Sequence, residues 1–400
     1  MIAEFKPCRL HGTVSAPPSK SMAHRYLIGA ALSGQTCTLC GVDFSEDILA
    51  SIDCLCALGA EITVSGDTVT VDPKGFMQVE APILECRESG STLRFFIPLA
   101  LCLGKTVTLC GSRRLLERPL DVYEELCRER RFEFRRDEST VTLCGKLESG
   151  AYQIRGDISS QFITGLIMAL VYLGEDSSIE ILPPFESRSY IDLTISVLTS
   201  FGVDVSFTEE YKIAIKASRM NAFSGRIEGD YSNAAFLDAF NHIGSEITIE
   251  NLRTDSLQGD RVYADYFHRI ANGTPTLDIS NCPDLGPVLF ALSALKNGAT
   301  FVGTDRLKAK ESDRAMAMHE ELSRLGGGLI LGENTVTVPK QTLRYQGKML
   351  DGHNDHRIVM AMSLILSQIG GSIGGVEAVK KSYPGFFKDI RQLGAEVNLQ

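Results

Sequence analysis

The residues with the clearest chemistry in this chain lie near its start, in the stretch 17–25 (PPSKSMAHR). Two prolines end the preceding extended run, and the serine after them is a good N-cap for a helix over Ala23–Leu32. Lys20, Ser21 and Arg25 then lie near the first turns, where free N–H groups and the helix dipole favour an anion. This combination predicts a phosphate-binding site, although an ordinary capped surface helix explains the stretch alone equally well.

Similar polar turns precede other helical patterns in the first half of the chain. A Ser/Gly-rich turn offers N–H groups to an anion, and two serines with a glutamine offer hydrogen bonds to a phosphate or a sugar-like ring. Taken singly, each turn is also explained by simple capping. The turns are 87–94 (RESGSTLR), 116–119 (LERP), 157–162 (DISSQF) and 187–190 (SRSY).

In the second half, charged clusters stand at helix starts, where cations oppose the helix dipole. A run of charges is usually a solvated face, but several such violations in one region indicate a bound anion that compensates them. The clusters are 308–314 (KAKESDR), 354–357 (NDHR), 380–384 (KKSYP) and the pair Pro283-Asp284.

Composition excludes several classes of protein. The chain has 400 residues and a net charge of −10, so it has no global basic field for nucleic acid. It lacks an apolar run long enough to span a membrane, and its first residues lack the apolar core of a signal peptide. We therefore expect a cytoplasmic protein of two ordinary domains that acts on small anions gathered by local clusters of Lys and Arg.

We expect no metal and no cofactor. Eleven cysteines in a cytoplasmic chain are reduced thiols. Cys37 and Cys40 lie in a strand pattern, and Cys54 and Cys56 lie two residues apart in a helical pattern, so their side chains diverge. His353 and His356 lie next to Arg357, which would repel a metal ion.

One pattern recurs six times: an amphipathic helix that ends in Leu-Gly or similar, then a strand, a tight turn and a strand. The copies are about seventy residues apart, with one shorter step of about fifty. The copy at 267–279 is degraded, and the last is cut short by the C-terminus. The copies lie at 54–71, 126–143, 197–215, 267–279, 321–338 and 390–399.

Three copies in each of two similar domains is the economical arrangement. A Ser/Gly/Asn-rich stretch at 221–226 marks the middle boundary, and the strand Ala3–Ala16 completes the second domain, because the last copy lacks room for all its strands. We therefore expect one domain over 20–225 and a discontinuous one over 1–19 plus 226–400. The chain crosses between them twice, which makes a hinge around a cleft.

The motifs carry a resemblance that covers nearly the whole chain. The chain resembles the 5-enolpyruvylshikimate-3-phosphate synthase (3-phosphoshikimate 1-carboxyvinyltransferase) family. The resemblance implies a mixed α/β (α+β) fold of two similar domains, each of three βαβαββ units (an α-β prism, or inside-out α/β barrel), that close on an interdomain cleft. The motifs, in the family's order, are SKSMAHR, ESGSTLR, ERP, DISSQF, KESDR, NDHR and KSYPGFF.

The resemblance implies transfer of the enolpyruvyl group of phosphoenolpyruvate to the 5-hydroxyl of shikimate 3-phosphate. Both substrates are small molecules, and we expect a monomer without nucleic-acid or membrane partners. The alternatives are the sister family, UDP-N-acetylglucosamine enolpyruvyl transferase, and a non-catalytic phosphometabolite-binding protein. The sister family's cysteine loop has no match here, and Ser21 stands where that family has Asn after the lysine. A protein that only binds anions gains nothing from Asp284 and Glu311.

The resemblance also implies a role for each matched residue. Asp284 is the base, and either Glu311 or Lys20 protonates the methylene carbon. The residues for shikimate 3-phosphate are Lys20, Ser21, Arg25, Ser159, Ser160, Gln161, Ser187, Asp284 and Lys310. Those for phosphoenolpyruvate are Lys20, Gly90, Arg118, Gln161, Arg314, Arg357 and Lys381.

Three departures from the family pattern affect these assignments. The turn 88–91 reads ESGS where the family often has Asn-Ala-Gly-Thr, and Phe95 replaces a frequent proline. Both leave the shape of the phosphoenolpyruvate pocket open, and with it the response to glyphosate, the family's inhibitor there. Arg306 replaces an asparagine that often contacts the phosphate of shikimate 3-phosphate.

Overall fold

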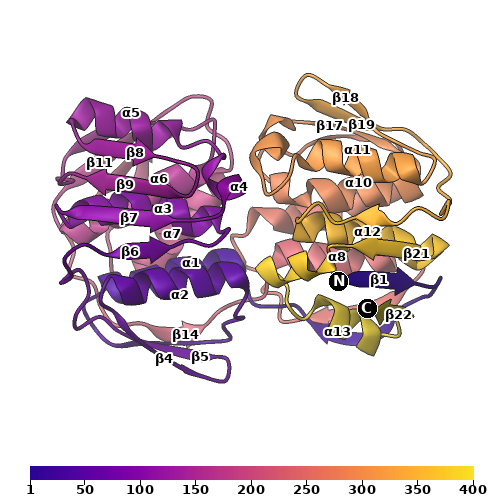
Figure 1. Ribbon diagram of the computed structural model, residues 1–400, viewed down its shortest axis with the longest axis horizontal. Coiled ribbons are helices and arrows are strands. Elements are labelled where there is room, and N and C mark those ends of the chain that lie inside the picture. The colour runs from indigo at the N-terminus through magenta and orange to yellow at the C-terminus, as the bar shows by residue number, and fades with distance from the viewer. The chain divides into compact units, whose positions relative to one another are not determined.

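The computed structural model describes residues 1–400 and divides the chain into two compact units (Figure 1). The central unit is Pro18–Glu228, and the terminal unit joins Met1–Pro17 to Gly229–Gln400. The boundaries expected from the sequence lie a few residues away, after 19 and after 225.

The central unit contains three four-stranded sheets with one strand order, β14-β3-β5-β4, β6-β7-β9-β8 and β10-β11-β13-β12. In each sheet the first two strands are parallel and the other pairs are antiparallel. Strand β5 reads TVTVD and buries its two valines, the alternation of a half-buried strand. The strands are β3 Cys37–Cys40, β4 Glu61–Ser65, β5 Thr68–Asp72, β6 Ile83–Glu85, β7 Thr106–Cys110, β8 Glu133–Arg136, β9 Thr140–Cys144, β10 Ala151–Arg155, β11 Ser177–Leu182, β12 Val205–Glu209, β13 Lys212–Ile215 and β14 Ser224–Arg226.

The central unit has three helices that are buried along most of their length. These are α1 Lys20–Leu32, α3 Gly90–Cys102 and α6 Ser160–Leu173. Helix α1 begins three residues before the predicted start, so Lys20 and Ser21 belong to its first turn. The other helices are α2 Glu46–Ala57, α4 Arg113–Leu116, α5 Asp121–Arg130 and α7 Arg188–Ser200.

The terminal unit repeats this plan with two four-stranded sheets, β16-β17-β19-β18 and β20-β21-β1-β22. Strand β1 (Ile2–Phe5) lies between β21 and β22, so the N-terminus completes the last sheet, as predicted. The single strand predicted over Ala3–Ala16 is wrong in one respect: it is two strands in two sheets, because β2 (His11–Ser15) pairs with β15. The remaining strands are β15 Glu246–Glu250, β16 Thr276–Asp278, β17 Ala299–Val302, β18 Ile330–Gly332, β19 Thr335–Val338, β20 Leu350–Asp351, β21 Gly371–Gly374 and β22 Val397–Leu399.

The degraded fourth copy of the repeat has a structural counterpart. Strands β2 and β15 form a two-stranded parallel sheet, and no hairpin comes after the helix α9 Tyr263–Asn272. The chain passes directly from α9 into β16, the first strand of the next sheet. The shorter step, between the fourth and fifth copies, therefore follows from the missing hairpin of the fourth unit.

The terminal unit also has three buried helices, α8 Tyr231–Asn241, α10 Gly286–Leu295 and α12 His356–Ile369. None of the helices in the structure is both long and apolar enough to cross a membrane. Helices α3, α6, α10 and α12 each follow the first strand of a sheet, and a motif of the sequence lies at the start of each of them and of α1. The outer helices are α11 Arg314–Arg324 and α13 Phe386–Gln392, with short 3₁₀ turns η1 Gly259–Val262, η2 Pro283–Leu285, η3 Asp305–Ala309 and η4 Val376–Lys381.

Candidate active site

In the central unit, the first turn of α1 carries a lysine paired with a carboxylate. The Lys20 Nζ lies 2.7 Å from Asp47 Oδ2, and both side chains are mostly buried. Asp47 lies in the first turn of α2, where an acidic residue favours the helix dipole. Sequence reasoning missed Asp47, because an acidic residue at a helix start is ordinary. The pair compensates the charge of Lys20 in a nearly dry position.

Arg25 lies one turn further along α1 and is 2 % exposed. Its Nε donates to Thr194 Oγ1 at 2.8 Å, and its Nη groups donate to Ser21 O at 2.7 Å and Tyr190 O at 3.0 Å. These acceptors are neutral, and burial lowers the pKa of Arg25 to about 10. Arg25 therefore ties α1 to α7, and its predicted contact with substrate stays a prediction.

Gly90 opens α3 and lies directly beneath a guanidinium. A Cβ at Gly90 would lie 2.6 Å from Arg118 Nη1, closer than real Cβ contacts come. The glycine thus lets Arg118, which is 7 % exposed, lie on the N-terminus of α3. The structure brings these two predicted phosphoenolpyruvate ligands together.

Gln161, in the first turn of α6, has its amide orientation fixed by two residues of α3. Arg94 Nη1 donates to Gln161 Oε1 at 2.8 Å, and Gln161 Nε2 donates to Ser91 Oγ at 3.0 Å. Ser91 is one of the residues that depart from the family pattern. Arg94 was not among the predicted site residues, although it ends the ESGSTLR motif.

The serines predicted to bind shikimate 3-phosphate lie at the starts of α6 and α7. Ser159 is the N-cap of α6, and its Oγ accepts from Gln161 N at 3.3 Å. Ser160 is the next residue and is 4 % exposed. Ser187, the N-cap of α7, is buried with φ 56°, a left-handed conformation that is rare for serine. Such a conformation persists where the surroundings fix it, as functional sites often do.

In the terminal unit, one carboxylate forms ion pairs with three cations. Asp284, in η2 before α10, lies 3.0 Å from Lys310 Nζ, 2.8 Å from Arg314 Nη1 and 3.1 Å from Arg357 Nη2. Burial alone would raise the pKa of Asp284, but the three cations hold it well below its usual range. The structure therefore joins four predicted site residues into one cluster.

Arg314 lies among the three carboxylates of this cluster. It lies 2.7 Å from Glu311 Oε2 and 2.9 Å from Asp355 Oδ2 as well as beside Asp284, and its side chain is 1 % exposed. Burial opposes its charge, yet the three carboxylates raise its pKa. Burial lowers the pKa of the neighbouring Lys310 to about 8. Asp355, a fully buried residue of the NDHR motif, was not predicted as part of the site.

Arg357 has hydrogen-bonding capacity to spare. Its Nη2 donates to Asp284, whereas its Nε and Nη1 are buried and have no hydrogen-bond partner. A buried charged donor without an acceptor is costly, so a bound anion would be stabilised there. This is the feature expected of a residue that holds a phosphate or a carboxylate.

Lys381 and Arg306 complete the predicted residues of this unit. Lys381 Nζ donates to Asn354 O at 2.6 Å, at the start of the NDHR motif. Arg306 lies in η3, and its charge contributes to the lowered pKa of Lys310.

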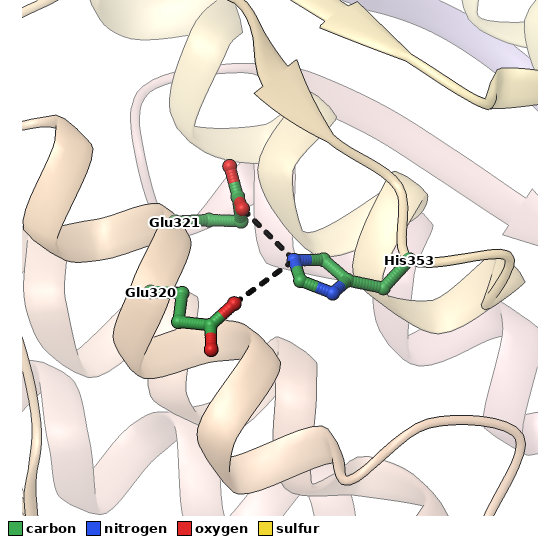
Figure 2. Close-up of side chains that lie close together, drawn as sticks. All are labelled: Glu320, Glu321 and His353. Carbon is green, nitrogen blue, oxygen red and sulfur yellow. Dashed lines mark hydrogen bonds and ion pairs between the residues drawn. The ribbon is translucent and has the colours of Figure 1, made fainter.

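One group of possible metal ligands comes together that the spacing of the sequence did not indicate. Figure 2 shows Glu320, Glu321 and His353, whose ligand atoms all lie within 4.8 Å of one another. However, His353 Nε2 is hydrogen-bonded to Glu321 Oε1, and Arg324 Nε lies 3.6 Å from the same oxygen. The nitrogen that would bind a metal is engaged, and a guanidinium faces the site, so the group is an ion-pair cluster.

Comparisons with known proteins agree with the motifs. The family model for EPSP synthase (3-phosphoshikimate 1-carboxyvinyltransferase) matches residues 5–390. The 3-phosphoshikimate 1-carboxyvinyltransferase of Clostridium kluyveri is 40% identical over 98% of this chain and 97% of its own. That of Clostridium novyi is 36% identical over the same shares of the two chains.

Solved structures show the same fold. An EPSP synthase from Acinetobacter baumannii has a TM-score of 0.77 and covers 100% of both chains at 21% identity. The mixed α/β fold implied by the family resemblance is confirmed by this match. With a family model across nearly its whole length and relatives of this identity, the chain belongs to the EPSP synthase (3-phosphoshikimate 1-carboxyvinyltransferase) family.

Proposed function

We propose that this enzyme transfers the enolpyruvyl group of phosphoenolpyruvate to the 5-hydroxyl of shikimate 3-phosphate and releases phosphate. Membership of the family supports the reaction. The observation that carries it at the level of residues is the cluster around Asp284, where a carboxylate lies among three cations, one of which is the partly unpartnered Arg357. A base and anion-binding groups are what the reaction requires.

In this proposal the residues divide between the two substrates as the family resemblance implies. The proposed ligands of shikimate 3-phosphate are hydroxyl, amide and cationic groups at helix starts of the central unit, together with Asp284 and Lys310 of the terminal unit. Phosphoenolpyruvate, which carries a phosphate and a carboxylate, is bound by guanidinium and ammonium groups. The first set is Lys20, Ser21, Arg25, Ser159, Ser160, Gln161, Ser187, Asp284 and Lys310, and the second is Lys20, Gly90, Arg118, Gln161, Arg314, Arg357 and Lys381.

The chemistry needs one proton taken and one given. The 5-hydroxyl oxygen attacks C2 of phosphoenolpyruvate while Asp284 takes the hydroxyl proton. Glu311 or Lys20 protonates C3, and a tetrahedral adduct forms. The group that protonated C3 then takes a proton back from this carbon while phosphate leaves C2, which restores the double bond. General acid–base action of this kind contributes on the order of 10²–10⁴-fold.

The cluster explains how Asp284 becomes basic when it is needed. Without substrate, three cations hold its pKa well below the usual range, so it is ionised but a weak base. Two of those cations, Arg314 and Arg357, are the proposed ligands of phosphoenolpyruvate. When the anionic groups of the substrate bind these guanidinium groups, the positive charge that stabilises ionised Asp284 is partly neutralised. The pKa of Asp284 then rises, and the carboxylate becomes a stronger base.

Three further properties belong to the proposal. We expect the two units to close around the substrates, with shikimate 3-phosphate binding first. We expect a monomer. We also expect the enzyme to work in the cytoplasm, where phosphoenolpyruvate is made and where its eleven thiols stay reduced.

The test is to identify the product formed with each acceptor. The purified protein is incubated with phosphoenolpyruvate and either shikimate 3-phosphate or UDP-N-acetylglucosamine, and the products are separated by mass. We expect an enolpyruvyl ether of shikimate 3-phosphate and no product with the nucleotide sugar. Transfer to the nucleotide sugar would assign the chain to the sister reaction, and no transfer to either would leave a binding protein.

A further inference from the structure

Helix α11 holds the segment 351–355 at two places. Arg314, in its first turn, binds the carboxylate of Asp355. Glu321 lies seven residues further, two helical turns along and therefore on the same face. Glu321 is 0 % exposed, which is rare for glutamate without a dedicated partner.

Both carboxylate oxygens of Glu321 are used on that segment. Oε2 accepts from Asp351 N at 2.9 Å, and Oε1 accepts from His353 Nε2 at 2.8 Å (Figure 2). Because an ionised carboxylate only accepts, Nε2 of His353 must carry the proton. The pair is thus a buried, charge-assisted bracket between α11 and the turn after β20.

The bracketed turn has an unusual backbone. His353 and Asn354 are consecutive residues with φ 49° and φ 50°, and neither is glycine. His353 N also donates to Asp351 Oδ1 at 2.7 Å. Two adjacent left-handed residues are strained and persist where the surroundings determine them. Glu321 supplies such a restraint from the neighbouring helix.

The turn leads directly into the phosphoenolpyruvate side of the proposed site. The carbonyl of Asn354 accepts from Lys381 Nζ, Asp355 Oδ2 accepts from Arg314 Nε, and Asp355 Oδ1 accepts from Arg357 N. The third contact is made by the backbone of Arg357, and all three residues are proposed phosphoenolpyruvate ligands. The path of residues 353–355 therefore sets where the side chains of Lys381 and Arg314 lie and where α12, the helix that carries Arg357, begins.

We propose that Glu321 and His353 are positioning residues for the phosphoenolpyruvate subsite, acting through the turn 353–355 on Lys381, Arg314 and Arg357. This inference rests on the proposed function. In this proposal neither Glu321 nor His353 contacts a substrate. Their contribution is to keep these three residues at the spacing that one small polyanion requires.

The charges around His353 favour its protonated form. Glu321 accepts its proton, Asp351 lies on the same turn, and Glu320 Oε2 lies 3.9 Å away. The hydrogen bond to Glu321 raises the pKa of His353, and Arg324 lies on the far side of Glu321. When His353 is protonated, its interaction with Glu321 gains from charge as well as from hydrogen bonding.

The variants separate positioning from general stability. His353→Leu removes the donor, and His353→Gln keeps an N–H at a similar reach. Glu321→Gln keeps the shape but replaces one acceptor with a donor. Glu320→Gln is the matched control, because Glu320 is on the same helix and near the same histidine but 49% exposed.

The measurements are steady-state constants for both substrates and thermal melts. For His353→Leu and Glu321→Gln we expect the KM for phosphoenolpyruvate to rise roughly 10-fold, with kcat and the KM for shikimate 3-phosphate within about two-fold. His353→Gln should recover most of the loss, and Glu320→Gln should match the parent. Thermal melts within a few degrees of the parent confirm that each variant folds.

The Glu321→Gln variant also has a characteristic pH profile. Its amide can donate to Nε2 of His353 when the imidazole is neutral, but two donors face each other when it is protonated. We therefore expect its KM for phosphoenolpyruvate to fall towards the parent value as the pH rises through the pKa of His353. The parent should show no such recovery.

Three results would overturn the inference. Equal rises in both KM values, or no difference from Glu320→Gln, would make the pair merely structural. A Zn²⁺-dependent thermal shift in the parent that His353→Leu abolishes would make the cluster a metal site instead. An inactive parent would refute the proposed function rather than this inference.

Discussion

The two units surround their cations with different chemistry. In the central unit, Arg25 donates to hydroxyl and carbonyl oxygens, and burial lowers its pKa. In the terminal unit, Arg314 lies among Asp284, Glu311 and Asp355, which raise its pKa. Both arginines are almost completely buried.

This difference separates binding from proton transfer. Neutral acceptors orient a guanidinium without competing for protons near pH 7, and hydroxyls can also donate to a ligand. Carboxylates can take and give protons, and their pKa depends on which cations remain beside them. The terminal unit is therefore suited to the acid–base steps, and the central unit, apart from the pair of Lys20 and Asp47, to holding polar groups of a substrate.

The largest expected effect comes from the carboxylate side. Asp284→Asn keeps the shape of the side chain but removes the base, so kcat should fall on the order of 10²–10⁴-fold. Binding of shikimate 3-phosphate, measured by calorimetry, should change far less. A variant that keeps activity within a few-fold of the parent would remove Asp284 from the base role.

Removal of each buried arginine tests the comparison directly. Arg314→Met leaves three carboxylates without their cation and should cost about 3–5 kcal/mol of unfolding free energy. Arg25→Met leaves neutral acceptors unsatisfied and should cost about 1–3 kcal/mol. Urea unfolding of both variants gives the two values.

The stabilities of Arg314→Met and Arg25→Met should also depend differently on pH. In the parent, Arg314 keeps the pKa of Asp355 lowered despite burial, so this stability is present above the unfolded pKa and is lost as the pH falls through the folded one. Without Arg314, burial raises the pKa of Asp355 above its unfolded value of about 3.9, so the deficit of Arg314→Met should grow as the pH rises from about 4 to 7. The deficit of Arg25→Met should stay flat. If the unfolding free energies of both variants depended on pH in the same way, the proposed difference between the surroundings of Arg314 and Arg25 would be wrong.

A smaller effect is expected where glycine makes room for a cation. Gly90→Ala would place a methyl group against Arg118, whose flexible end can move away at little cost to stability. We expect the KM for phosphoenolpyruvate to rise by up to roughly 10²-fold with an unchanged melting temperature. Gly273→Ala is the control, since nothing lies within 4 Å of a Cβ there. An unchanged KM would mean that the position of Arg118 is unimportant.

The smallest effect concerns the lysine whose pKa is about 8. As the pH rises from 7 to 9, Lys310 loses its proton, so the affinity for shikimate 3-phosphate should fall by up to about ten-fold. Lys310→Arg stays charged over this range and should give a flat profile. A parent profile as flat as that of the variant would show that Lys310 does not bind the substrate as a cation.

Much of the fold was predictable because the repeat is periodic and local. The hairpins after amphipathic helices, and the return of the N-terminus into the last sheet, could be inferred from strand patterns and from room at the C-terminus. The split of Ala3–Ala16 into two sheets was missed, because the five residues between the strands, 6–10 (KPCRL), do not reveal which strand each half pairs with. The missing hairpin of the fourth copy was visible as a degraded pattern.

The site was less predictable where the interacting residues lie far apart in the sequence. Motifs gave the residues at helix starts, such as Lys20 and Arg357. Asp47 and Arg94 were missed because their partners lie tens of residues away, and no local pattern shows such pairs. Glu321 was missed for a related reason: it looks like a polar residue of an amphipathic helix until its burial is known.

The most direct test measures whether the two ligands stabilise the protein cooperatively when both are bound. Thermal melts are recorded with shikimate 3-phosphate, with glyphosate as a non-reacting occupant of the phosphoenolpyruvate subsite, and with both. At about 100 times its dissociation constant, shikimate 3-phosphate alone should add ~2.7 kcal/mol of stability, and glyphosate alone much less. Together they should shift the melt by more than the sum, because ordering of the site is needed once. Simple additivity would contradict a joint site.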